Sequence, residues 1–189
     1  MTTATGKQEQ ERVLILGAGN TIMADEGIGP VALETLASHF DFPPQVELLD
    51  VATTGLAMLT YLEGYDHLII IDAAKDSGHE PGTVIFYTPE DLADRQVMHS
   101  AHDQRLTDVL FAAAMSGIEL KSVVIVGVQI AVLTEWVMEL SEPVAAAVPV
   151  ACAAALHRLR ELGYEATSKP DTDASLVLKA LDEYAPVNE

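Results

Sequence analysis

Short apolar runs alternate along the chain with segments in which apolar residues recur three or four positions apart. The runs are rich in valine, isoleucine and leucine and are bounded by glycine, proline or acidic residues, which is typical of strands. The segments between them have the periodicity of amphipathic helices. The pattern predicts strands at residues 13–16, 46–51, 67–71, 83–87 and 121–129 and helices at 28–40, 55–62, 104–115 and 141–162.

Strands that alternate with helices favour a doubly wound α/β fold, in which helices cover both faces of a mainly parallel sheet. We expect five strands, and the run at 83–87 suits an antiparallel strand at the edge, because it follows a Pro-Gly turn closely. Residues 1–164 are expected to form a single α/β domain with a flexible N-terminus at 1–11. Residues 165–189 are expected to form a polar tail that can hold one short helix.

Composition and charge narrow the possible partners. The chain has 189 residues, 49% of them hydrophobic, which is enough for one substantial core. Ten basic residues against 29 acidic ones leave a formal charge of -19. This charge repels phosphate backbones and anionic lipid headgroups, so we expect neither nucleic acid nor membrane surfaces as partners.

The sequence also points to a cytoplasmic location. Residues 1–12 are polar and lack the apolar stretch of a secretory signal. The longest apolar stretch, 144–156, is shorter than the roughly 20 residues that a bilayer crossing needs. The single cysteine, Cys152, lies within this stretch and is expected to be a buried thiol, so a disulfide, a CxxC pair and a cysteine nucleophile have no support.

A glycine-rich segment joins the first strand to the first helix, where a doubly wound fold places its ligands. Gly17 and Gly19 fit the first two glycines of a dinucleotide-binding loop, and Asp50 ends the second strand, where a ribose-binding acid would lie. However, Ile22 replaces the third glycine, and acids at 25 and 26 stand where a pyrophosphate needs the positive start of a helix. The segment therefore disfavours a nucleotide.

Two acids near the carboxyl ends of predicted strands are candidates for binding a cation. Glu26 lies at a helix entrance, where it could cap the helix or serve as a metal ligand, whereas for Asp25 we favour capping. Asp72 directly follows the apolar run at 67–71, and an uncompensated carboxylate there would be costly to bury. Asp72 is thus expected to bind a cation or metal rather than only to cap a loop.

A histidine cluster precedes the predicted helix at 104–115. Either His99 or His102 could join the two carboxylates, and spacing alone does not choose between them. A mixed carboxylate and imidazole set suits zinc, nickel or iron, and three protein ligands leave positions open for substrate or water. The sequence predicts a metal site at this edge of the sheet.

Several motifs together resemble those of the NiFe hydrogenase maturation endopeptidases, which trim a C-terminal extension from the hydrogenase large-subunit precursor after nickel insertion. The resemblance spans residues 13 to about 162. The motifs that carry it are Gly17-x-Gly19-Asn20, Asp25-Glu26-Gly27-x-Gly29, the run from Asp66 to Ala73, Pro81-Gly82-Thr83, and Ser100-x-His102 with Leu106, Asp108, Val109 and Leu110.

The resemblance implies that Glu26, Asp72 and His102 are both the metal ligands and the catalytic residues. It implies that nickel is carried by the precursor, while zinc or cadmium could occupy the site in the isolated protein. The expected activity is that of a nickel-dependent, aspartyl-type endopeptidase, which activates an enzyme by completing its maturation. The metal would polarise the scissile carbonyl or activate a water, with a carboxylate as base. The large-subunit precursor is the expected partner, and the protein itself is expected to be monomeric.

Two other functions are compatible with parts of the pattern. One is a non-catalytic nickel-sensing maturation chaperone that uses the same three ligands. The other is a Rossmann-type nucleotide-binding protein, which the glycine segment disfavours.

Overall fold

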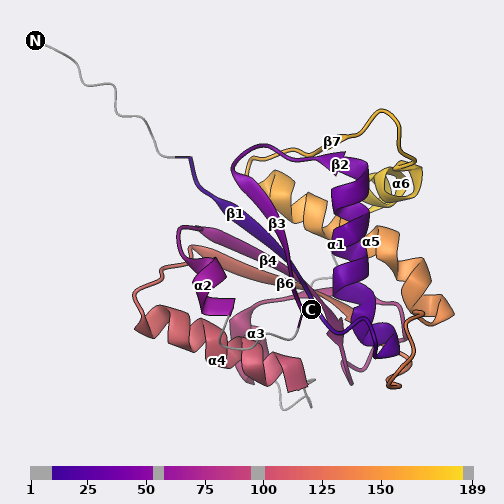
Figure 1. Cartoon of the computed structure of the whole chain (residues 1–189), viewed down its shortest axis with the longest axis horizontal. Helices are drawn as coiled ribbons and strands as arrows, with labels where there is room; N and C mark the ends of the chain where they lie inside the picture. The colour runs from indigo at the N-terminus through magenta and orange to yellow at the C-terminus, as the bar shows by residue number, and fades with distance from the viewer. Residues whose placement is uncertain (1–9, 53–57, 95–100, 185–189) are drawn as a thin grey trace, which may run out of the picture.

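The computed structural model describes residues 10–52, 58–94 and 101–184. Its centre is a five-stranded sheet in the order β3-β1-β4-β6-β5 (Figure 1). The first four of these strands run parallel, and β5 pairs antiparallel with β6 at the edge. This confirms the predicted fold class. The strands are β1 Val13–Ala18, β3 Val46–Ala52, β4 His67–Ala74, β5 Val84–Tyr87 and β6 Ser122–Gln129.

Helices cover both faces of the sheet, as Figure 1 shows. Alternate side chains of β1 enter two separate apolar clusters, because successive strand residues point to opposite faces. One cluster includes α1 (Ile28–His39) and α5 (Glu142–Glu161), and the other includes α4 (Ala101–Met115). The remaining helices before β6 are η1 (Ala24–Gly27), α2 (Leu59–Leu62) and α3 (Pro89–Asp94).

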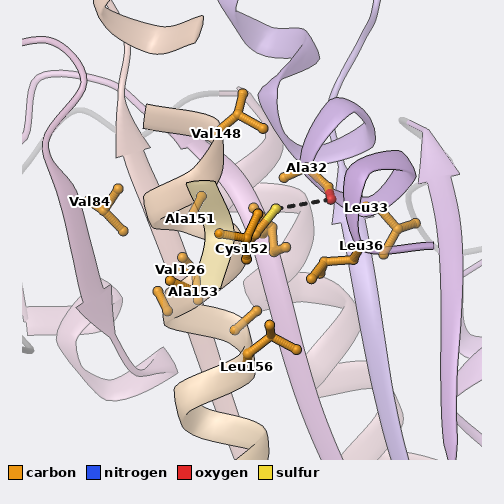
Figure 2. Close-up of a cluster of buried hydrophobic side chains, with 14 of the residues drawn as sticks. Ala32, Leu33, Leu36, Val84, Val126, Val148, Ala151, Cys152, Ala153 and Leu156 are labelled. Atoms are coloured by element: carbon orange, nitrogen blue, oxygen red, sulfur yellow. Dashed lines mark hydrogen bonds between the residues drawn. The ribbon is translucent and has the colours of Figure 1, made fainter. Parts of the chain in front are cut away.

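The two helices of the first face pack closely through small side chains. Figure 2 shows Cys152 of α5 beside Ala32 of α1, where its thiol donates to the Ala32 carbonyl at 3.3 Å. Cys152 is fully buried, and this burial raises the pKa of the thiol to about 12. The prediction of a buried thiol is confirmed.

Several boundaries differ from those that the sequence predicted. Strand β4 continues three residues beyond 71, because residues 72–74 still pair with β6, so Asp72 lies inside the strand and not after it. Helix α4 begins at Ala101, so His102 is already helical. Of the predicted helix 55–62, residues 55–57 lie outside the described residues, and α2 starts at Leu59.

The C-terminal segment packs on the domain. A short strand, β7 (Thr167–Ser168), pairs with β2 (Phe40–Asp41) in the segment expected to be a polar tail. Helix α6 (Ser175–Glu183) then buries Val177 and Leu181 in the cluster that contains α1 and α5. Among the described helices, including the 20-residue α5, none combines the length and apolarity needed to cross a bilayer.

Candidate functional site

The start of α1 lies directly on the carboxyl ends of β1 and β4. A Cβ at Gly29 would come 2.0 Å from the carbonyl oxygen of Ala18 and 2.4 Å from that of Ile71, distances that real atoms do not reach. Only glycine therefore allows this helix to approach both strands so closely. The contact brings the glycine-rich segment to the same sheet edge as Asp72, which follows Ile71.

Glu26 is positioned by a tight turn at this edge. It lies in η1, and only 7% of it is exposed. Its backbone carbonyl accepts a hydrogen bond from the N–H of Asn20 at 3.1 Å, which closes the loop. Gly19 has a φ of 142°, and a Cβ there would lie 1.9 Å from the same carbonyl. The glycine pattern thus serves to fold the loop back onto Glu26.

Asp72 is a second buried carboxylate at the same edge. It pairs with Gly127 in the sheet and is 3% exposed. Its Oδ1 accepts a hydrogen bond from the N–H of Ala73 at 2.8 Å. Its neighbours Ile71 and Ala73 point towards α1 and α5, so Asp72 points towards the face that α4 covers.

The backbone of His102 also belongs to this edge. Helix α4 returns the chain to the start of β6, so its amino end lies towards the carboxyl ends of the parallel strands. Its 15 residues extend about 22 Å, close to the length of the strands it covers. The His102 side chain and all of His99 lie outside the described part of the structure, so the predicted choice of His102 stays a prediction.

The structure does not test the predicted metal set as a whole. Among the described side chains, no group of three or more histidine, cysteine, aspartate or glutamate residues has an arrangement that could hold a metal. The predicted set needs the imidazole of His102, which lies outside the described side chains. Two carboxylates and one imidazole from this edge remain the candidate ligands, with donor atoms that suit nickel or zinc.

Asp25 does not cap a helix, and the expectation that it does so is wrong. Neither η1 nor α1 has a side-chain cap. The carboxylate of Asp25 is fully buried and accepts four hydrogen bonds from the segment between β6 and α5. The donors are the N–H groups of Ala131 at 2.9 Å, Val132 at 2.7 Å and Ser141 at 2.6 Å, and the Ser141 hydroxyl at 2.8 Å.

The segment between β6 and α5 is the part of the site that the pattern of the sequence missed. Three backbone contacts join it to residues 22–25, which immediately precede Glu26. Its one visible signal was an isolated run of large apolar residues between a strand and a helix, including the chain's single tryptophan, Trp136. Apolar residues in a loop are usually read as minor core contacts, whereas Trp136 is 79% exposed.

The geometry also disfavours the nucleotide alternative. Two buried acids precede α1, and they oppose an anion at the helix start. Asp50 is exposed and lines a hollow of about 320 Å³ with Thr21 and Pro30, and neither Glu26 nor Asp72 is among the residues that line it. The site therefore suits a cation better than a phosphate.

Comparisons with known proteins show what this chain is similar to. Residues 30–158 match the family model described as hydrogenase maturation protease. The chain is 36% identical over 158 residues to the hydrogenase 2 maturation protease of Escherichia coli K12, covering 82% of this chain and 94% of the relative. It is 32% identical over 168 residues to the hydrogenase expression/formation protein HupD of Rhizobium leguminosarum bv. viciae, covering 88% of this chain and 83% of that protein.

Solved structures show the same likeness. The hydrogenase maturating endopeptidase HybD from E. coli superposes with a TM-score of 0.77 at 34% identity, over 85% of this chain and 99% of the other. The NiFe hydrogenase maturation protease HybD from Thermococcus kodakarensis gives a TM-score of 0.66 at 28% identity, over 78% of this chain and 98% of the other.

Proposed function

Because this chain belongs to the hydrogenase maturation protease family, we propose that it removes the C-terminal extension of a NiFe hydrogenase large-subunit precursor after nickel insertion. In this proposal Glu26, Asp72 and His102 recognise the nickel that the precursor carries. The assignment to a protease family favours an endopeptidase over a non-catalytic nickel-sensing chaperone.

The observation that supports the proposal is that two carboxylates are buried near the same end of the sheet. Glu26 and Asp72 are 7% and 3% exposed, although burying a carboxylate is costly unless its charge is compensated. Asp72 points towards the face that α4 covers, whereas Glu26 precedes α1 on the other face. The backbone of His102 reaches the same sheet edge. Two oxygen donors and an imidazole form a mixed set of the kind that nickel accepts.

The side chains of this site have distinct tasks in the proposed reaction. A bound metal would supply Lewis acidity to the scissile carbonyl or to the attacking water. The carboxylates of Glu26 and Asp72 would bind and orient the metal-bearing segment, and one of them would accept a proton from water as general base.

The proposal makes cleavage depend on cofactor assembly. Since nickel would arrive with the precursor, a precursor without nickel would lack the group that the three ligands recognise. Removal of the extension would then activate the hydrogenase only when its metal is in place. We place this reaction in the cytoplasm, with the protein acting as a monomer, and we expect zinc or cadmium to be able to bind the three ligands in the isolated protein.

The test is a processing assay with nickel-loaded and nickel-free precursor, read by the mass of the precursor. The wild-type protein should shorten only the loaded form. Glu26→Gln, Asp72→Asn and His102→Ala should each abolish the shortening, while Asp50→Asn, which changes an exposed acid on β3, should not. Normal processing by any of these three variants would contradict the proposed role of the residue that it changes. A wild-type protein that binds the loaded precursor without shortening it would favour the chaperone.

A further inference from the structure

An exposed apolar surface lies beside the candidate site. It is formed by one residue of the loop before η1 and four of the segment between β6 and α5. We call it the 132–138 surface. Its members and their exposed fractions are Ile22 38%, Val132 40%, Leu133 44%, Trp136 79% and Met138 69%.

The 132–138 surface is held in a fixed position rather than left as a loose loop. The N–H of Trp136 donates to the carbonyl of Ile22 at 2.7 Å, and the N–H of Ala24 donates to the carbonyl of Val137 at 2.7 Å. Asp25 adds its four hydrogen bonds to the same segment. In Figure 1 this segment, between β6 and α5, lies beside the start of α1. The backbone that carries the exposed side chains is therefore held in place.

The junction also holds two residues in a costly backbone conformation. Trp136 has a φ of 66° and Ala24 has a φ of 51°, in the left-handed region that residues with a side chain rarely adopt. Such a backbone conformation is strained, and strained residues concentrate at functional sites. At Trp136 the strain is not offset by burial of the indole, because the side chain is exposed.

We infer that the 132–138 surface docks an apolar segment of the large-subunit precursor, with Trp136 as its main anchor. The inference rests on the proposed function. Its structural basis is that this surface adjoins the candidate site. Residues 22–25 form the hydrogen bonds to this surface, and Glu26 is the next residue along the chain. A precursor segment that brings its metal to Glu26 would therefore lie near this surface.

Charge limits the chemistry of the docked segment. Glu135 and Glu139 are exposed on either side of Trp136 and Met138, and the whole chain carries a formal charge of -19. An acidic partner segment would be repelled here, whereas an apolar segment bordered by basic side chains is attracted. The flexible thioether of Met138 beside a rigid indole is a combination that adapts to apolar side chains.

The direct test uses the fact that Trp136 is the only tryptophan in the chain. Full-length protein labelled with 5-fluorotryptophan should give one fluorine resonance. Addition of the nickel-loaded precursor should shift that resonance and reduce its exposure to solvent, measured by the H₂O/D₂O isotope shift. An unchanged resonance at saturating precursor, with binding shown independently by calorimetry, would overturn the inference.

Kinetics supply the second measurement. Trp136→Ala should raise KM for the nickel-loaded precursor by about 10-fold or more with little change in kcat, because a docking contact is made equally in the bound and transition states. Trp136→Phe should recover most of the loss. Leu176→Ala, which removes an apolar side chain of 67% exposure on α6, is the matched control and should leave both constants unchanged.

The outcomes separate docking from cleavage. A protected fluorine resonance without any cleavage by the wild-type protein would retain the docking surface and reject the proposed function. Cleavage by Trp136→Ala with wild-type KM would reject the docking surface and retain the proposed function.

Discussion

The carboxylate of Asp25 accepts hydrogen bonds from both the N–H and the hydroxyl of Ser141, at 2.6 and 2.8 Å. Ser141 is the residue that precedes α5 and lies 116 positions after Asp25, so one buried side chain connects the starts of two distant helices. Ser141 occupies the N-cap position of α5, but its hydroxyl donates to Asp25 and makes no cap bond. The consequence is that Asp25 fixes the turn that carries Glu26.

Removal of the Asp25 carboxylate should therefore destabilise the fold. Asp25→Ala would leave three backbone N–H groups and one hydroxyl without their acceptor inside the protein. We expect the free energy of unfolding to fall by about 3 kcal/mol or more, measured by urea denaturation. Asp25→Asn should recover only part of this loss, because the amide nitrogen is a donor facing other donors.

The matched control for Asp25 is Glu34→Ala, which removes an exposed acid from α1. It should change the free energy of unfolding by no more than about 0.5 kcal/mol. If Asp25→Ala proved equally mild, the four hydrogen bonds would not hold the segment between β6 and α5 in place.

Two glycines of one motif should respond differently to alanine. A Cβ at Gly29 would lie 2.0 and 2.4 Å from backbone oxygens of β1 and β4, so Gly29→Ala must lift α1 away from the sheet edge. We expect a lower midpoint in thermal unfolding and loss of precursor processing, since Glu26 would be displaced relative to Asp72.

Gly27→Ala is the control for this substitution. The nearest atom to its Cβ would be the Thr21 Cα at 3.3 Å, which a shift of a few tenths of an ångström relieves, and Gly27 has a φ of -74°. Gly27→Ala should retain most of the stability and processing. Equal damage from both substitutions would argue against the close approach at Gly29 as the cause.

An ion-pair network at the opposite end of the sheet should make stability depend on pH. Lys121 contacts Glu11 at 2.6 Å and Asp66 at 2.8 Å. The pKa of Glu11 is lowered from 4.5 by hydrogen bonds with His67 and then Lys121. The pKa of Asp66 is lowered from 3.8 by the Lys121 hydrogen bond and then by the N–H of Arg12.

Both carboxyl groups have a lower pKa in the folded state than in the unfolded state. Their contribution to stability is therefore complete at pH values above the unfolded-state pKa and is lost as the pH falls through the folded-state pKa. Lys121→Met should thus reduce the urea midpoint at pH 7, and the difference from wild type should shrink below about pH 4. For Lys179→Met, on the exposed face of α6, the difference in urea midpoint from wild type should not depend on pH in this way. A constant difference down to pH 3 would be inconsistent with this network.

The fold class was determined by the sequence, because continuous apolar strands and periodic helices have few arrangements that bury both sheet faces. In the runs at 13–16 and 67–71, successive apolar residues point to opposite faces of the sheet, so both faces are apolar. Each face packs against its own helices. The end of β4 was misjudged because an acid normally marks the end of a buried run. Pairing with β6 continues through Asp72, and sheet hydrogen bonds depend on the backbone and not on side-chain polarity.

The sequence by itself also determined that Glu26 and Asp72 belong to the same end of the sheet, since parallel strands present their carboxyl ends together. Only the tertiary structure decided that Asp25 supports a distant segment and that Trp136 stands exposed beside the site. Both depend on which backbone groups face one another across 106 to 116 residues of chain. Local periodicity cannot encode such contacts, because a buried acceptor is satisfied by whichever donors the completed fold brings to it.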